Sequence, residues 1–273
     1  MRKIFMVFIF VAFVYASHEN IGVSPESRAL GESTVSMGLG ISGVFSNPAG
    51  LMDATNLQVA LFYEKPYGAQ GIGNINSAFL GIKYTKFAIS FSEYYAKLEG
   101  DYSGLYSEGI YSLSYAIPFG VLSLGSNLNV YKFQDPRFGT DFTAGLDFGL
   151  LTRISDFVSA GICYHNVFRA RIRGENLPYY LDAGIRVSVR DLSRSLIAFR
   201  MMPSSQVVLM FGEEVDLVKN ILTLRGGLSY GNDTRKASLG LSVKAIEKFT
   251  ISYSFSSNFE LSPAHSLGVV YGR

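Results

Sequence analysis

The chain contains few side chains that could carry out covalent chemistry. Its histidines are His18, His165 and His265, and its single cysteine is Cys163. Cys163 and His165 are two residues apart and would share one face of a strand, but two ligands do not make a metal site. The histidines show no metal-ligand spacing. We therefore predict no catalytic residues, no bound metal and no cofactor.

Seven charged residues instead fall on the small, polar face of segments that alternate apolar with polar residues. A charge in such a position requires water or a partner of opposite sign. These residues either form an ion-pair network that braces the wall of an enclosed interior or line a path for a substrate, and both readings stay open. The seven are Lys83, Asp147, Asp182, Arg186, Arg190, Arg225 and Lys244.

Segments of about ten residues position these charges. Ile251, Tyr253 and Phe255, for example, alternate with three serines, and this period of two predicts a strand with one apolar and one polar face. The pattern recurs from residue 57 onward. It predicts fourteen strands, at 58–64, 76–85, 87–96, 107–117, 121–133, 142–154, 157–167, 179–189, 194–202, 206–216, 221–231, 236–245, 249–257 and 264–272.

The connections differ in length according to their position. Those after even-numbered strands are tight, whereas those after the first, third, fifth and seventh strands are longer. Short turns at one end, longer loops at the other and tyrosines or phenylalanines near many strand ends are typical of an outer-membrane barrel. We predict an all-β fold, a transmembrane outer-membrane β-barrel of about fourteen antiparallel strands; a soluble β-sandwich or a lipocalin-like barrel is the alternative.

The first sixteen residues predict export. A basic start, the apolar run at residues 4–14 and small residues near Ala16 are typical of a signal peptide at 1–16, because eleven apolar residues are too few to span a bilayer as a helix. Its removal takes away two positive charges and leaves 22 Lys plus Arg against 22 Asp plus Glu. A neutral chain without basic runs excludes nucleic acid as a partner.

Residues 17–56 differ from the rest of the chain. They lack strand alternation, and Pro48 breaks whatever precedes it. We predict that this segment forms a hatch inside the barrel formed by residues 57–273, where its polar groups find partners; a loose periplasmic tail is the alternative. Residues 38–43 match the dinucleotide-binding fingerprint, but they lack the βαβ context it requires, and we reject that reading.

The sequence resembles the FadL-type outer-membrane superfamily, and more narrowly its PorV/PorQ-like branch. The resemblance is carried by residues 27–31 (SRALG), by the Ile117-Pro118-Phe119-Gly120 turn and by stretches in the last fifty residues. Its most specific element is the turn Asn47, Pro48, Ala49, Gly50 and Leu51. The resemblance implies a fourteen-stranded barrel with an N-terminal hatch, and this turn placed within the barrel.

The same resemblance implies two kinds of activity. FadL-type members move fatty acids or other hydrophobic compounds, and PorV-type members shuttle secreted-protein cargo. We predict a non-enzymatic protein of the bacterial outer membrane whose partners are membrane lipid and either a hydrophobic small molecule or secretion-system proteins. A sealed structural or assembly barrel is the alternative, and a membrane hydrolase using His265 with Ser262 or Ser266 is a weaker one.

Overall fold

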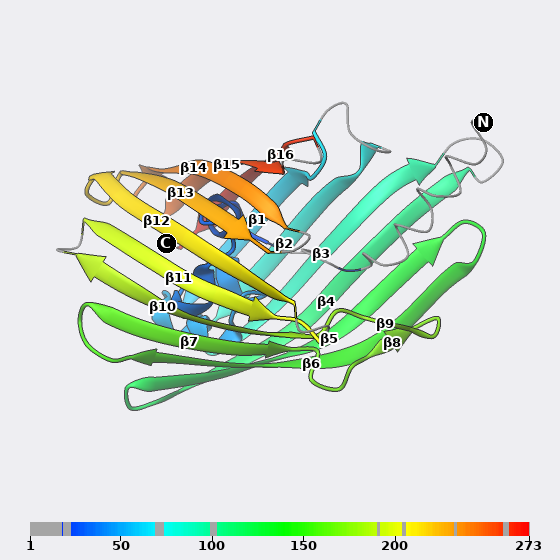
Figure 1. Ribbon diagram of the computed structural model, residues 1–273, viewed down its shortest axis with the longest axis horizontal. Helices are drawn as coiled ribbons and strands as arrows, with labels where there is room; N and C mark the ends of the chain where they lie inside the picture. Colours follow the sequence, from blue (N-terminus) through cyan, green and yellow to red (C-terminus); the bar gives the residue numbers. More distant parts are fainter. Residues whose placement is uncertain are drawn as a thin grey trace.

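The computed structural model describes residues 18, 23–68, 74–98, 103–189, 192–203, 206–231, 234–258 and 262–272. Fourteen strands of this part of the chain close into one antiparallel barrel (Figure 1). The barrel strands are β1 (Leu57–Lys65), β2 (Asn76–Tyr84), β3 (Phe87–Leu98), β4 (Gly104–Phe119), β5 (Leu122–Asp135), β6 (Gly139–Arg153), β7 (Val158–His165), β10 (Tyr180–Val189), β11 (Ser193–Met201), β12 (Val207–Val218), β13 (Leu222–Tyr230), β14 (Arg235–Ile246), β15 (Phe249–Asn258) and β16 (Ala264–Tyr271).

Each barrel strand pairs with the barrel strand that precedes it along the chain, and the first and last strands close the ring. In that closing pair Val59 of β1 faces Tyr271 of β16. Closure pairs the backbone groups that a free sheet edge would expose. All fourteen predicted strands are confirmed, with ends that differ by a few residues, and the β-sandwich alternative is wrong.

A short hairpin lies in the connection between β7 and β10, which the sequence pattern predicted as a loop. It consists of β8 (Arg171–Ile172) and β9 (Glu175–Asn176) and forms a separate two-stranded sheet. Its buried side chains, Ile172 and the neighbouring Leu177, pack with Ile110 and Tyr131 of the barrel wall. The hairpin therefore folds against the interior at this end of the barrel.

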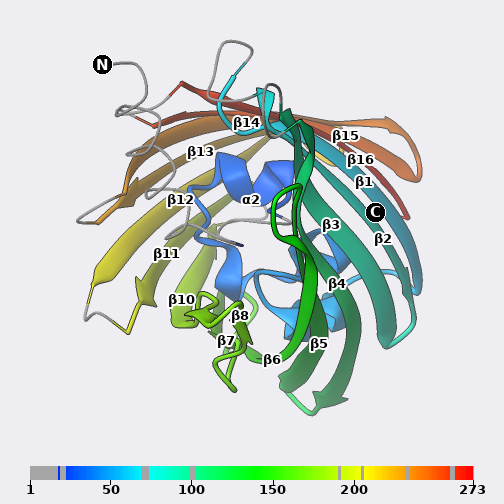
Figure 2. The same ribbon diagram turned by 90° about the vertical axis from the view of Figure 1, so that its right-hand side faces the viewer.

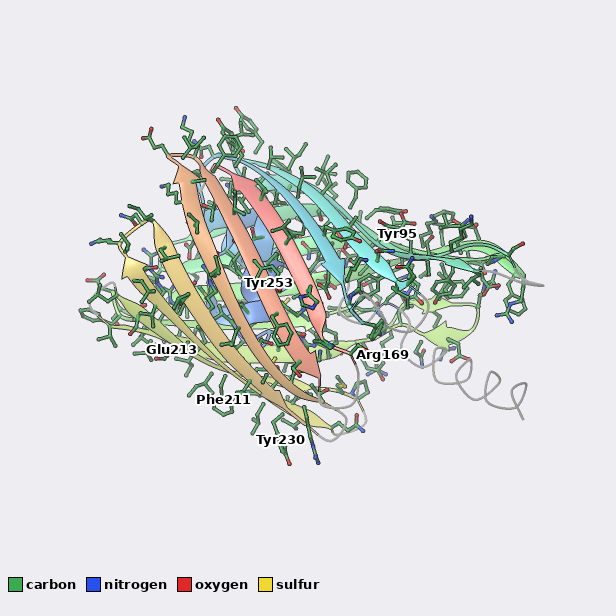
Figure 3. The ribbon with its side chains drawn as sticks, turned by 90° about the horizontal axis from the view of Figure 1, so that it is seen from above. Tyr95, Arg169, Phe211, Glu213, Tyr230 and Tyr253 are labelled. Carbon is green, nitrogen blue, oxygen red and sulfur yellow. The ribbon has the colours of Figure 1, made fainter. Side chains whose placement is uncertain are left out.

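The two faces of the wall have opposite chemistry. Ser252, Ser254 and Ser256 of β15 are buried, whereas Ile251 and Tyr253 of the same strand are exposed on the outside. On β12 and β13, Phe211 and Tyr230 likewise point away from the barrel (Figure 3). The outside is apolar and the inside is small and polar, as the alternation of the sequence requires.

Aromatic side chains lie near many strand ends, as predicted, but Tyr94 and Phe133 face the interior of the barrel and not its outer surface. Phe87, Phe119 and Phe142 are exposed on the outer face. Tyr94 and Phe133 instead pack against the interior cluster that holds the β8–β9 hairpin. Position near a strand end did not distinguish the two groups, because the inner or outer face depends on parity along the strand.

The strands differ in length around the ring. β4, β5 and β6 have 16, 14 and 15 residues, whereas β11 and β13 have 9 each. The long strands therefore extend beyond their neighbours at one end of the barrel (Figure 1). The β8–β9 hairpin lies against β6 near this end.

Residues 23–56, here called the N-terminal segment, lie within the ring of strands (Figure 2). None of the described helices is long and apolar enough to cross a membrane. Its helices are α2 (Pro25–Ala29) and the 3-10 turns η1 (Thr34–Ser36), η2 (Gly40–Gly43) and η3 (Pro48–Asp53). Helix α2 contacts β13–β16, and η1 contacts β7 and β10. The turn η2 contacts β1 and β2, and η3 contacts β4–β6.

Two predictions concern residues that the structure does not describe. The signal peptide assigned to residues 1–16 and Arg190 both lie outside the described residues. The hatch assigned to residues 17–56 stays a prediction, and residues 17 and 19–22 of that range are also outside the described part.

Candidate functional site

Strand register brings a row of inward polar side chains together on one side of the barrel. Asn127 of β5 faces Asp147 of β6, and Asp182 of β10 faces both Cys163 of β7 and Arg200 of β11. These positions share the inward parity of their strands, so their side chains lie next to one another inside the wall.

Asp147 is the centre of a hydrogen-bonded group. The backbone N–H of Asn166 donates to Oδ1 at 2.8 Å, and Nδ2 of Asn129 and of Asn127 donate to Oδ2 at 2.8 and 3.2 Å. Asn127 also donates to the carbonyl of Val44 at 3.0 Å, which connects this group to the N-terminal segment. The carboxylate is thus held in place by amide donors.

His165 lies between two carboxylates. Its Nδ1 is 4.0 Å from Oδ2 of Asp147, and its Nε2 is 3.7 Å from Oδ2 of Asp182. The imidazole stacks on Tyr180 with ring centroids 4.4 Å apart, and the guanidinium of Arg200 lies 4.2 Å from the same tyrosine ring. The two aspartates and the histidine therefore form one buried cluster with Arg200.

A network of ion pairs joins the N-terminal segment to the wall. Arg28 pairs with Glu32 at 2.9 Å and with Glu64 of β1 at 2.8 Å. Lys236 and Arg200 reach Glu32 at 3.3 and 3.5 Å, and Arg200 also binds Asp182 through two hydrogen bonds of 2.9 and 3.0 Å. The ion-pair cluster consists of Arg28, Glu32, Glu64, Asp182, Arg200 and Lys236.

The cluster stabilises the charged forms of the two residues that the N-terminal segment contributes. Burial acts to raise the pKa of Glu32, but Lys236, Arg28 and Arg200 outweigh it and hold this pKa well below its ordinary value. Burial likewise acts to lower the pKa of Arg28, but Glu64 and Glu32 outweigh it and raise this pKa. Both side chains are therefore ionised in the folded protein at neutral pH.

The turn at residues 47–51, here called the Asn47 turn, makes a second connection to the wall. Oδ1 of Asn47 accepts from the backbone N–H of Ala49 at 3.1 Å, and Nδ2 donates to the carbonyls of Val35 and Leu150 at 2.8 and 3.0 Å. Pro48 occupies the first position of η3, where its missing N–H costs nothing. The Asn47 turn is thus fixed against β6.

Two wall glycines allow this close approach. A Cβ at Gly125 of β5 would lie 2.2 Å from the backbone nitrogen of Ala49. One at Gly149 of β6 would lie 2.1 Å from Oδ1 of Asn47. Any larger residue at either position would push the turn away from the wall, so the turn and these glycines form one packing unit.

The remaining predicted interior charges have separate roles. Lys83 is buried and donates to the carbonyls of Ala54 and Thr55, where the N-terminal segment ends. Arg225 of β13 forms an ion pair with Glu214 of β12. Arg186 and Lys244 are half-buried.

Between the segment and the row of inward polar residues lies a cavity of about 70 Å³. Ser42 and Phe45 of the segment line it on one side. Asp147, His165 and Tyr180 line it on the wall side. Polar groups from both walls thus converge on a single space, which makes this cavity the candidate site.

Among the described residues, no group of three or more histidine, cysteine, aspartate or glutamate side chains could hold a metal ion. His265 points to the outer face, where its Nδ1 is 2.7 Å from the hydroxyl of Tyr253. Ser266 is buried on the inner face, so the histidine and this serine point to opposite sides of the strand.

Several residues of the site were not predicted from the sequence. Glu64 and Arg200 occupy inward positions of predicted strands, so parity alone could have found them. Arg28 and Glu32 lie four residues apart in a segment without strand periodicity, and only their spacing signals a pair. The pairing of His165 with Asp147 required the register between neighbouring strands, which the sequence did not provide.

Comparisons with known proteins relate this chain to others by fold. Neither models of known protein families nor curated protein sequences match it. Among solved structures, the CymD monoaromatic hydrocarbon channel superposes with a TM-score of 0.70 at 14% identity, over 92% of this chain and 98% of that one.

Two further structures are similar. The Ralstonia pickettii toluene transporter TbuX gives a TM-score of 0.63 at 13% identity, over 92% of this chain and 97% of the other. A Pseudomonas aeruginosa FadL homologue gives 0.62 at 12% identity, over 92% and 98%. The chain thus shares the barrel fold of these proteins.

Proposed function

We propose that this protein is a channel of the FadL type in a bacterial outer membrane, in which residues 17–56 form a hatch that controls passage of small hydrophobic compounds. The observation that carries the proposal is a closed barrel with an apolar outside whose interior is occupied by the N-terminal segment. Leu239 and Ile197, which are 66% and 59% exposed, represent the outer surface that lipid would cover.

The names of the similar solved structures and the apolar patches inside the barrel support a substrate class. Phe62 and Phe79 stack with centroids 4.7 Å apart, and Phe45 contacts Phe79 edge-on at 6.0 Å. The similar solved structures are named as a hydrocarbon channel and a toluene transporter, which supports a small aromatic compound as the substrate.

Fractionation and uptake together test this proposal. We expect the protein in the outer-membrane fraction, with gel mobility that changes on boiling, and as a mature chain that begins at residue 17. We also expect proteoliposomes that contain it to take up toluene faster than empty liposomes. Recovery in the soluble periplasm with unchanged mobility would contradict the membrane location, and equal uptake would contradict transport.

The closeness of the Asn47 turn to Gly125 and Gly149 favours a second candidate, a sealed barrel that serves as a secretion-system or cargo-shuttling component of the PorV/PorQ-like kind. Such a barrel would pass neither ions nor toluene and would co-purify with envelope proteins. Planar-bilayer conductance and the uptake assay separate the two candidates, because only the channel predicts flux.

A further inference from the structure

The charges around the interior cavity do not balance. Every carboxylate of the ion-pair cluster has an arginine or lysine partner, but Asp147 has none among the described residues. Its side chain is 4% exposed, its hydrogen bonds come from neutral amides, and the ring of His165 lies 4.0 Å away. A buried carboxylate without a fixed cation is costly, so this position favours a positively charged group from outside the protein.

Two polar atoms of the same cavity also make no hydrogen bond within the described part of the chain. These atoms are Oγ of Ser42 and Nε2 of His165. Both residues line the cavity, Ser42 from the N-terminal segment and His165 from β7, and both are more than nine-tenths buried. Buried polar groups are normally hydrogen-bonded, so two atoms without such a bond facing one space indicate where a ligand would donate or accept.

The rest of the lining supplies aromatic surface. Phe45, Tyr131 and Tyr180 contribute rings to the cavity wall. The face of an aromatic ring attracts cations and packs against other rings, and Tyr180 already binds the guanidinium of Arg200 in this way. A ligand with an aromatic body and a cationic head therefore matches the wall better than a plain hydrocarbon.

We propose that this cavity is a binding site for a small aromatic amine, whose ammonium group pairs with Asp147 and hydrogen-bonds to Ser42 and His165. A primary ammonium has three donors and one positive charge. The lining also contains Arg200, but this cation already pairs with Glu32 and Asp182, so Asp147 is left for the ammonium group and the aromatic rings hold the body of the ligand. The proposal rests on the proposed function, because the barrel must admit small molecules to its interior.

A series of three ligands of similar shape tests the proposal on the wild-type protein. Benzylamine, benzyl alcohol and toluene are titrated calorimetrically into the full-length mature protein in detergent micelles at neutral pH, with protein-free micelles as the blank. We expect benzylamine to bind at least about tenfold more tightly than benzyl alcohol, because only its head carries a charge. Equal affinities for the two would overturn the proposal.

Substitutions locate the binding. Asp147→Asn keeps the size of the side chain and removes its charge. We expect this variant to bind benzylamine at least about tenfold more weakly and to bind benzyl alcohol with unchanged affinity. Asp141→Asn, at an exposed rim pair with Arg173, is the matched control and should leave both affinities unchanged. Unchanged benzylamine affinity in a heat-modifiable Asp147→Asn protein would overturn the site. If this variant does not fold, the ligand series on the wild type decides.

The outcomes separate this proposal from the proposed function. Toluene uptake together with equal affinities for benzylamine and benzyl alcohol would refute the amine-binding site but support the channel. Tighter binding of benzylamine without any toluene uptake would support the amine-binding site and refute hydrocarbon transport.

Discussion

Two of the attachments of the N-terminal segment to the barrel wall work by different physical means. At one place the ion-pair cluster joins Arg28 and Glu32 to charged residues of four strands. At the other, the Asn47 turn rests directly on Gly125 and Gly149. The first attachment depends on charge and can be altered by pH, whereas the second depends on the absence of side chains and is insensitive to it.

The cavity lies between these two attachments, with Glu32 and Arg200 of the ion-pair cluster and Ser46 beside the Asn47 turn in its lining. Its lining also keeps polar atoms that make no hydrogen bond, such as Oγ of Ser42 and Nε2 of His165. The contrast indicates that stability is concentrated at the two attachments and binding capacity between them. Substitutions at each place should reveal that division.

Removal of Arg28 from the ion-pair cluster should lower the stability of the protein more than any change at the Asn47 turn. Arg28→Met leaves Glu32 and Glu64 buried without their closest cation, and we expect it to lower the free energy of unfolding by about 3–5 kcal/mol. Urea unfolding in micelles, followed by the change in gel mobility, measures this. Arg173→Met removes an exposed pair and serves as the control, with a cost of about 0–1 kcal/mol. Equal losses in the two variants would refute the importance of the cluster.

A methyl group on the wall should have the next largest effect. Gly125→Ala places a carbon 2.2 Å from the backbone of Ala49, and we expect a loss of about 1–3 kcal/mol from the resulting displacement. At Gly226 the nearest atom to an added Cβ is 3.7 Å away, so Gly226→Ala should be nearly neutral. The same unfolding assay compares them, and a loss in Gly226→Ala as large as in Gly125→Ala would argue against close packing of the turn.

Loss of the Asn47 side-chain amide should lower the free energy of unfolding by a smaller amount. Asn47→Ala removes the acceptor for Ala49 and the donor to Val35 and Leu150, and we expect about 1–2 kcal/mol of destabilisation. Asn76→Ala, at an exposed strand end, is the control. Thermal unfolding of both variants tests this prediction. It fails if Asn47→Ala has the same melting temperature as the wild-type protein.

Acidification should have the smallest effect and should act on one attachment alone. The folded-state pKa of Glu32 is depressed, so its ionised form stabilises the fold above its ordinary value of 4.5, and this contribution is lost as the pH falls below that value. We expect the melting temperature to decrease between about pH 5 and about pH 3, and Glu32→Gln to show a smaller decrease. An identical pH dependence in the two proteins would exclude Glu32 as its source.

The sequence predicted the barrel well because two-residue periodicity depends on local chemistry alone. Each strand had to place one apolar and one polar face, and parity therefore located Asp147, Asp182, Lys83 and Arg225 on the inside. The β8–β9 hairpin was missed because strands of two residues carry no readable period. The partners of these charges were missed because they depend on register between strands and on the path of the N-terminal segment, which has no period.

Cys163 sits where the second helix of the N-terminal segment covers the wall, packed with Val35 and Met210 and fully buried. It is also the single thiol of the chain. A maleimide dye can therefore reach it when the covering segment moves aside, and the labelling rate reports how often that happens. The buried thiol is thus a natural probe for any movement of the covering segment and needs no engineered cysteine.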